Sequence, residues 1–173
     1  MAPKSKATKQ GDAASLIYPP FLYLGPRTSS SAAFITAHGI THVLSIGSTP
    51  TAKVASVSYH RLPLTDSPTA SIDKIIGLAS AVIDSARAGK ILVHCSAAVS
   101  RSPTVVAAYL MTRCGLSLKD ALGLIVKARP AVCPNEGFLS QLKELEMELR
   151  GECSLDVDIL PGKKEDRLAL FNS

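Results

Sequence analysis

The amino-acid sequence predicts an α/β fold in which helices flank a mixed central sheet. Strand-like and helix-like segments alternate in the first half of the chain, and helical patterns dominate the second half. The length of 173 residues points to one compact domain. A hydrophobic content of 46% is ample for a single buried core, and 19% charged residues are too few for a disordered chain.

Four segments are expected to form strands, because they are rich in apolar and β-branched residues and are bounded by turn residues: 16–25, 42–47, 57–64 and 91–94. The first should end at Gly25-Pro26. The last is short and apolar, which is typical of a buried parallel strand.

Five segments are expected to form helices: 29–38, 71–88, 101–113, 117–128 and 136–150. The clearest is 71–88, whose Ile, Val and Ala residues fall on one face. Its predicted N-cap is Ser71 and its predicted end is Gly89. Ser117 and Pro130 should bound the fourth helix in a similar way.

The chain divides by composition into three parts. Residues 1–14 are small, polar and basic and should form a flexible tail, 15–150 the folded domain, and 151–173 an extension that is either a tail or partly docked. The N-terminus lacks the apolar core of a secretory signal, and no apolar run approaches the ~20 residues that span a bilayer. We therefore expect a cytoplasmic or nuclear protein with no membrane partner.

Composition also argues against nucleic-acid, metal and disulfide functions. The net charge of +5 is diffuse, which suits steering of anionic substrates or ordinary solvated surface, whereas nucleic-acid binding requires a clustered basic stripe. The four cysteines, at 95, 114, 133 and 153, form no CxxC pair and indicate reduced thiols. The four histidines are not paired with carboxylates at metal spacing, so neither a metal nor another cofactor is expected.

Chemistry is expected where the strand 91–94 leads into the helix at 101. Five small residues separate Cys95 from Arg101: Ser96, Ala97, Ala98, Val99 and Ser100. Residues 95–100, here called the Cys95 loop, can curl round one tetrahedral anion, and the helix N-terminus adds its partial positive charge. The same field favours the Cys95 thiolate, which is the nucleophilic form. Arg101 can return over the loop and bind two phosphate oxygens. An inert buried thiol is the competing interpretation of Cys95.

These residues carry a family resemblance. The stretch VHCSAAVSRSP (93–103) resembles the HCxxGxxR signature of the protein tyrosine phosphatase superfamily, and SRSPTVVAAYLM resembles its dual-specificity branch. Four further segments are similar to that branch: FLYLG (21–25), GITHVLSIG (39–47), the segment around Asp66, and PNEGFLSQL (134–142). The resemblance covers about residues 20–148. It implies a protein tyrosine phosphatase-like fold, with 15–150 as the catalytic domain.

The resemblance also implies roles for three residues outside the loop. Asp66 would be the general acid. It is the only acidic residue between 13 and 94 that lies outside the predicted helix. The alternative is that Asp66 is a turn residue, because Asp-Ser-Pro favours a turn. Ser102 would help the thiolate leave, or else serve backbone groups in the first helical turn. His94 would order the loop and support the thiolate, or else be a satisfied core residue.

The implied reaction is hydrolysis of phosphotyrosine and phosphoserine/threonine in proteins through a cysteinyl-phosphate. Position 98 is Gly in the family and Ala here. An Ala forced to a positive φ costs of order 1 kcal/mol, so we expect Ala98 to weaken catalysis. The alternative function is a pseudophosphatase-like module that binds phosphate with little turnover.

The substrate class follows less directly. The uncharged Ala97, Val99 and Ser100 argue against an inositol lipid. Arg129 is either a second anion site for a doubly phosphorylated peptide or a cap of its own helix C-terminus. Cys114 should lie far from the Cys95 loop, and it and Cys133 are interpreted as structural thiols rather than disulfide partners of Cys95. No oligomeric state is predicted.

Overall fold

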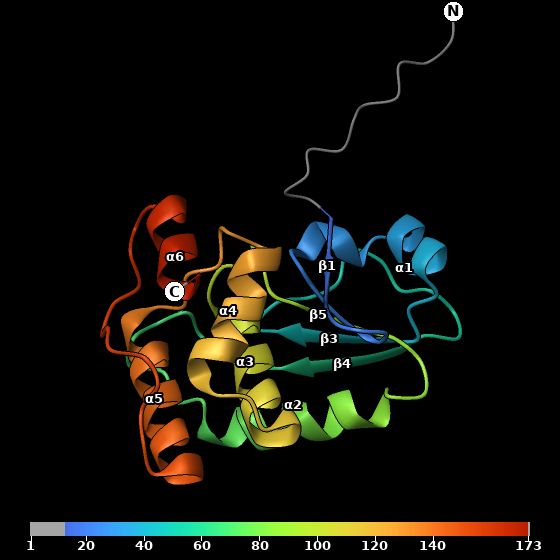
Figure 1. Cartoon of the computed structure of the whole chain (residues 1–173). Coiled ribbons are helices and arrows are strands. Elements are labelled where there is room, and N and C mark those ends of the chain that lie inside the picture. Colours follow the sequence, from blue (N-terminus) through green and yellow to red (C-terminus); the bar gives the residue numbers. More distant parts are fainter. Residues whose placement is uncertain (1–12, 173) are drawn as a thin grey trace, which may run out of the picture.

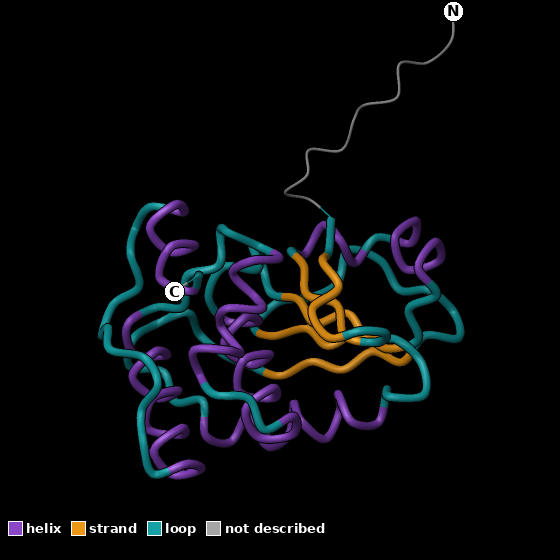
Figure 2. Tube along the Cα trace, viewed as in Figure 1, coloured by secondary structure: helices purple, strands orange, loops and turns teal. Residues whose placement is uncertain are grey.

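A five-stranded mixed sheet lies at the centre of the molecule (Figures 1 and 2). The computed structural model describes residues 13–172, so most of the predicted N-terminal tail, 1–12, lies outside the described residues. The strand order is β1-β2-β5-β3-β4. Only β1 is antiparallel to its neighbour, β2; the other pairs are parallel. The strands are β1 Ser15–Tyr18, β2 Leu22–Gly25, β3 His42–Ile46, β4 Ser58–Leu62 and β5 Ile91–His94.

Helices cover the two faces of the sheet unequally. A large cluster of buried residues joins one face to α2, α3, α4 and α5, whereas a small cluster joins the other face to α1. This arrangement confirms the predicted α/β class with a mixed sheet. The helices are η1 Arg27–Ser30, α1 Ala32–His38, α2 Asp73–Ser85, α3 Arg101–Cys114, α4 Leu118–Ala128, α5 Glu136–Arg150 and α6 Lys164–Phe171.

The single strand predicted over 16–25 is wrong: this stretch forms two antiparallel strands. Ser15 pairs with Leu24 and Tyr18 with Leu22, so the chain reverses at Pro19-Pro20. Two consecutive prolines cannot donate an N–H to a sheet ladder, and their φ angles are fixed by the ring. Both properties favour a turn at this point. The other predicted strands are confirmed to within two residues at each end.

Helix α2 begins later than predicted because another helix supplies its N-terminal contacts. Ser71 is not the N-cap; Ile72 occupies that position, and it makes no side-chain cap. The Gln141 side chain of α5 instead accepts from the N–H of Ile72 (2.9 Å) and donates to the carbonyl of Ala70 (2.8 Å). The predicted end at Gly89 is also wrong, since α2 ends at Ser85. Serine caps are present at Ser31 and Ser117, as the sequence indicates.

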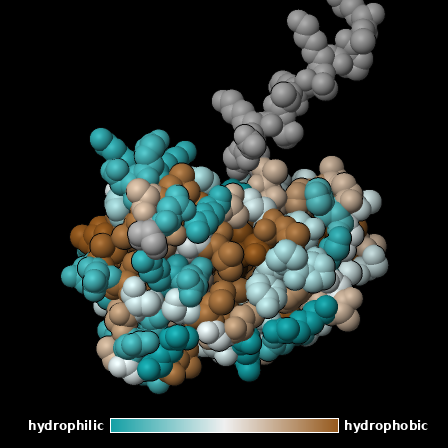
Figure 3. Space-filling view, viewed as in Figure 1, coloured by the Kyte–Doolittle hydropathy of each residue, from teal (hydrophilic) through white to brown (hydrophobic). Residues whose placement is uncertain are grey.

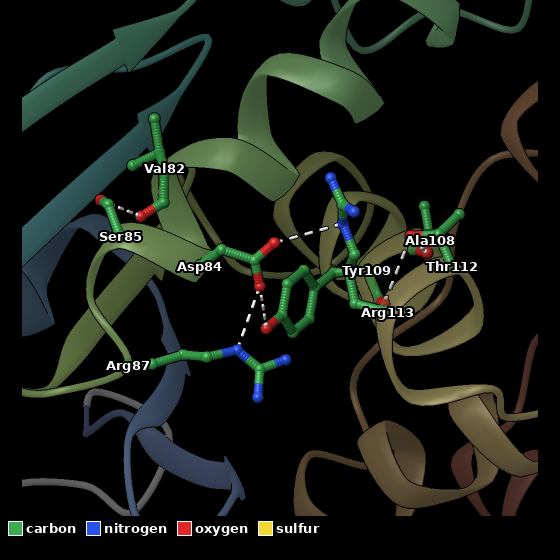
Figure 4. Close-up of polar contacts among 8 residues, drawn as sticks. All are labelled: Val82, Asp84, Ser85, Arg87, Ala108, Tyr109, Thr112 and Arg113. Atoms are coloured by element: carbon green, nitrogen blue, oxygen red, sulfur yellow. Dashed lines mark hydrogen bonds and ion pairs between the residues drawn. The ribbon is translucent and has the colours of Figure 1, made fainter.

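A polar cluster fixes α2 to α3 (Figure 4). Asp84 accepts from the Tyr109 hydroxyl (2.9 Å) and pairs with Arg87 (3.1 Å) and Arg113 (3.2 Å). Burial alone would raise the pKa of Asp84, but the hydrogen bonds from Tyr109 and Arg87 hold it below its ordinary value. Because α3 starts at the Cys95 loop, this cluster anchors the far part of the helix that carries the loop.

The C-terminal extension is docked, which decides between the two predicted alternatives. Leu155, Leu160 and Phe171 are buried in the main core cluster. The buried Arg167 of α6 donates to the carbonyls of Pro130 (2.9 Å) and Pro161 (2.7 Å), which ties the extension to the end of α4.

Buried Glu146 of α5 makes a second joint to the extension. Its carboxylate accepts from the N–H of Leu118 (2.8 Å), at the start of α4, and from the N–H (2.9 Å) and hydroxyl (2.7 Å) of Ser154. Burial alone would raise the pKa of Glu146, but these hydrogen bonds hold it below its ordinary value. The charged carboxylate therefore stabilises the folded state.

Some apolar surface remains visible. On the face drawn in Figure 3, hydrophobic residues gather in the middle, between α4 and β1. Among the described residues, no helix is long and apolar enough to cross a membrane. The intracellular location expected from the sequence stays a prediction.

We expect Glu146→Gln to lower the free energy of unfolding at pH 7 by about 2–4 kcal/mol, because an amide presents N–H groups to donors that now face a carboxylate. The loss should shrink as the pH falls below the ordinary value of 4.5, since a group with a depressed folded pKa stabilises the protein only while it is ionised. Urea unfolding at several pH values measures both. Exposed Glu148→Gln is the control, expected within ~0.5 kcal/mol of the parent. A pH-independent loss would contradict this account.

Candidate active site

The candidate site lies where four parallel strands end. The segments that follow β2, β5, β3 and β4 contain Arg27, Cys95, Gly47 and Asp66 respectively. Because the carboxyl ends of parallel strands meet at one edge of a sheet, these four segments are brought together although they are far apart in sequence.

The Cys95 loop joins two buried elements. All four residues of β5 are buried, and so are residues 102–111 of α3. Cys95 is 2% exposed, whereas Ser96 and Ala97 lie at the surface and form the open side of the loop. Ser100, at the N-cap of α3, makes no side-chain cap to the helix. The N–H groups of Arg101 and Ser102, at the start of α3, therefore receive no side-chain cap from Ser100.

Arg101 closes the loop from above. One terminal nitrogen donates to the hydroxyl of Ser96 (3.0 Å), at the start of the loop, and the other donates to the carbonyl of Gly47 (2.8 Å). Gly47 has φ +59°, and a Cβ there would lie against the carbonyl oxygen of Leu64 and 2.6 Å from the Arg101 guanidinium. Glycine at position 47 is therefore required for this approach.

The Cys95 sulfur has one hydroxyl partner. The buried Ser102 Oγ donates to Cys95 Sγ over 3.1 Å. The hydroxyl is thus a hydrogen-bond donor placed directly at the sulfur. Ser102 directly follows Arg101, so the two residues at the start of α3 contact opposite ends of the candidate site's chemistry: Ser102 the sulfur and Arg101 the open side of the loop.

His94 is neutral and its tautomer follows from its partners. Its Nδ1 lies 3.0 Å from the Cys95 carbonyl, which can only accept, so Nδ1 carries the proton. Nε2 then accepts from the hydroxyl of Ser45 (2.7 Å). Burial lowers the pKa of His94, against the effect of the bond to Cys95, and the charge of Arg27 lowers it further. The ring therefore holds the backbone at Cys95 without adding charge.

Ala98 adopts the positive φ that a glycine would accommodate more easily at this position. Its φ is +54°, in the left-handed region, and its side chain is buried in the same cluster as Cys95. An alanine in this region costs about 1–2 kcal/mol relative to a relaxed backbone. The loop therefore accommodates the methyl group but carries strain at this residue.

The loop is held on both flanks by backbone bonds. The N–H of Arg27 donates to the carbonyl of Ser96 (2.9 Å) on one side, and the N–H of Cys133 donates to the carbonyl of Val99 (2.8 Å) on the other. The N–H of Asn135 donates to the Ser100 hydroxyl (3.0 Å) on this second side. Neighbouring segments thus fix the loop before any ligand binds.

Asn135 also reaches Asp66. Its amide nitrogen donates to Oδ1 of Asp66 (3.0 Å), and its amide oxygen accepts from the N–H of Phe138 (2.9 Å) as the N-cap of α5. Asp66 is exposed. One asparagine therefore connects the Asp66 segment to the Cys95 loop.

Gly137 allows the Asp66 segment to approach α5. A Cβ at this position would lie against the carbonyl group of Pro68, two residues beyond Asp66. Arg27, Gly47, Asn135 and Gly137 are contributors that the sequence did not single out. Their roles depend on contacts between segments distant in sequence, although the PNEGF and SIG segments were recognised as family-like.

Of the remaining predicted residues, Cys133 contacts the Cys95 loop through its backbone N–H. Burial lowers the pKa of Arg129, and the charge of nearby Cys95 acts against that shift. Arg129 donates to the carbonyl of Ala13 (2.7 Å) and the hydroxyl of Ser15 (3.3 Å), so its guanidinium reaches the start of β1. Cys114 ends α3, away from the loop, whereas Cys133 lies beside Val99. All four cysteines are free thiols.

Comparison with known proteins identifies the family to which the chain belongs. A family model, the catalytic domain of dual specificity phosphatases, matches residues 22–148. The chain belongs to this family. It is 41% identical over 134 residues to dual specificity protein phosphatase 5 of Rattus norvegicus, covering 75% of this chain and 35% of that protein. The chain spans about a third of the length of the first curated relatives that it matches.

Two solved structures show the same fold. The crystal structure of human DUSP28 is 32% identical, with a TM-score of 0.73, and covers 79% of this chain and 95% of that one. The crystal structure of human tyrosine phosphatase-like serine/threonine/tyrosine-interacting protein is 31% identical, with a TM-score of 0.73. The match covers 79% of this chain and 97% of that one. The protein tyrosine phosphatase-like fold expected from the sequence is confirmed.

We expect Gly137→Ala to push the Asp66 segment away from α5, since the new methyl group meets backbone rather than a flexible side chain. Overpacking of this kind costs about 1–3 kcal/mol of stability. Hydrogen exchange at residues 66–70 should rise. The matched control is Gly77→Ala in α2, where a Cβ meets open space and helix propensity predicts a gain of about 1 kcal/mol. Equal effects at both glycines would contradict the close approach.

Proposed function

We propose that this chain is a cysteine-dependent protein phosphatase that hydrolyses phosphotyrosine and phosphoserine/threonine through a cysteinyl-phosphate. One observation carries the proposal: two functional groups meet at one small loop. The buried Cys95 sulfur accepts a hydrogen bond from Ser102, and the Arg101 guanidinium spans the loop to Ser96. The family's name is consistent with this activity.

In the first step, the Cys95 thiolate attacks phosphorus while the loop N–H groups and Arg101 hold the phosphoryl oxygens. The bond from phosphorus to the substrate oxygen breaks, and Asp66 gives its proton to that oxygen. Oδ1 of Asp66 accepts from Asn135, so the transferred proton is carried on Oδ2. Arg101 would exchange its bond to Ser96 for bonds to phosphoryl oxygens.

In the second step, the Asp66 carboxylate takes a proton from water as the water oxygen attacks phosphorus. The phosphorus–sulfur bond breaks, Cys95 leaves as a thiolate, and inorganic phosphate is released. The hydroxyl of Ser102 already donates to the sulfur, so it is positioned to stabilise the departing thiolate. His94 acts through the backbone as a positioning residue, since its ring contacts the Cys95 carbonyl and not the sulfur.

Ala98 supports a second candidate function. The strain at φ +54° disfavours this residue's backbone geometry and weakens the preorganisation of the loop N–H groups. A chain that binds phosphorylated residues but hydrolyses them slowly would serve as a phosphate-recognition module. Phosphorylated proteins are the expected partners under both functions.

Hydrolysis of a small aryl phosphate, without added metal, tests the two candidates. We expect turnover in the parent, none in Cys95→Ser, and an increase of up to about tenfold in Ala98→Gly, as the loop relaxes and binds the transition state better. Activity in Ala98→Gly alone would assign the parent to the binding module. Absence of turnover in both, with both folded, would overturn the phosphatase proposal.

Asp66→Asn should lower kcat by about 10²–10⁴-fold for a phosphotyrosine peptide, because general acid catalysis typically supplies that factor. The loss should be smaller for an aryl phosphate with a more acidic leaving group, since such a group departs without a proton. Steady-state rates on the two substrates check this. Exposed Asp73→Asn, in the first turn of α2, is the control. An equal loss on both substrates would contradict the role of Asp66 as an acid.

A further inference from the structure

A group of cations surrounds the loop that follows β3. Arg27, Lys53 and Arg61, here called the basic rim, are all exposed. Residues 13–65 contain no Asp or Glu, so no local carboxylate neutralises them. Within residues 13–172 none of the three forms an ion pair with a carboxylate. This is unusual for a surface on which both signs of charge are ordinarily mixed.

Three arginines hold three consecutive carbonyl groups of this loop. Arg101 donates to Gly47, Nε of Arg61 donates to Ser48 (3.0 Å), and Nε of Arg27 donates to Thr49 (2.7 Å). The loop therefore fixes the guanidinium groups of Arg27 and Arg61 in the same row as the arginine that closes the Cys95 loop.

The two outer arginines keep part of their donor capacity. Nε of Arg27 donates to the carbonyl of Thr49, and its Nη2 makes a longer bond to the carbonyl of Pro50 (3.4 Å). Within the described residues, Nη1 of Arg27 and both terminal nitrogens of Arg61 make no hydrogen bond. Side chains anchored through Nε lose little entropy when their remaining N–H groups bind an anion.

A pocket opens beside this row. It has a volume of about 380 Å³ and is lined by residues of the loop 49–53, by Tyr59 to Arg61 of β4, and by Ser45 of β3. Its charged residues are Lys53 and Arg61, and no carboxylate lines it. Ser45 is hydrogen-bonded to His94, immediately before Cys95, so a buried contact links the lining of the pocket to the strand that carries the Cys95 loop. The N–H bond from Arg27 to Ser96 brings the rim to the edge of the Cys95 loop.

We propose that the basic rim is a second anion site, which binds a phosphate or carboxylate group on a residue that flanks the scissile phosphoresidue of a protein substrate. The proposal rests on the proposed function, since it assigns a substrate class to the same site. The site lies across the Cys95 loop from Cys133 and Asn135, which hold the opposite flank. Substrates with two neighbouring negative charges would then be preferred over those with one.

Binding to the Cys95→Ser protein tests the site separately from catalysis. The probes are fluorescent phosphotyrosine peptides that carry phosphoserine, aspartate or serine at the flanking positions. We expect the phosphoserine and aspartate peptides to bind more tightly than the serine peptide. Arg27→Gln and Arg61→Gln should each reduce this preference by about three- to fivefold, as loss of an exposed ion pair does, and high salt should reduce it too. A gain with phosphoserine alone would assign the site to phosphate, and similar gains with both would assign it to anions generally.

Two controls separate charge recognition from support of the loop. The first control is Arg150→Gln. Arg150 also donates to a backbone carbonyl, that of Gly115, but it lies at the opposite end of α5 from Asn135. We expect this variant to leave the peptide preference unchanged. Arg27→Lys keeps the charge and should retain most of the preference. A purely structural role would lower affinity for all three peptides equally.

The outcomes for this site and for catalysis are distinguishable. An unchanged preference in the Arg27→Gln/Arg61→Gln double variant overturns the second anion site, whatever the hydrolysis rates. Peptide preference without aryl phosphate hydrolysis in the parent and Ala98→Gly supports the site and overturns the phosphatase. Failure of the folded Cys95→Ser protein to bind any of the peptides overturns the second anion site, and it overturns both proposals only if the parent and Ala98→Gly also fail to hydrolyse the aryl phosphate.

Discussion

The Cys95 loop has to connect a strand and a helix that are both buried, and this constraint organises the rest of the site. Neither β5 nor α3 can move without disturbing the core, so the loop that joins them has fixed ends. Its carbonyl groups are then satisfied from outside, by Arg27 on one flank and Cys133 on the other. A loop defined by its ends and its backbone partners can tolerate a methyl group at position 98, although the residue is strained.

The parts around this loop differ in how firmly they are held. The Ser102 hydroxyl and the neutral ring of His94 are buried beneath it, where water cannot weaken their hydrogen bonds. Asp66 lies on an exposed segment and is held through one amide of Asn135. This division would suit the proposed two-step transfer, in which Cys95 needs a constant environment and Asp66 has to come close to leaving groups of different shape.

Local patterns predicted much of this architecture, and contacts between distant segments account for the errors. Strand β5 and helix α5 have the predicted bounds because their periodicity and flanking residues are strong. The N-cap of α2 lies one residue beyond the cap predicted at Ser71, whose hydroxyl accepts only a long bond from the N–H of Asp73 (3.4 Å). The shorter bond at that end of α2 is made with Gln141, which is distant in sequence. Cys95, Arg101 and Ser102 could be grouped from one short motif, whereas the parts played by Gly47 and Asn135 depend on which strand ends meet at one sheet edge. The placement of Arg61 beside Ser48 has the same origin.

The buried Glu146 joint shows that the region matched to the family and the cooperative folding unit need not coincide. The family match ends at residue 148, yet two of the three donors to Glu146 belong to Ser154. A polypeptide trimmed to the shared region would keep every residue of the candidate site and still leave a carboxylate in the core with one partner. The extension therefore contributes to the stability of the folded unit that carries the Cys95 loop, and changes at Ser154 would alter the melting temperature without removing a contact of Cys95.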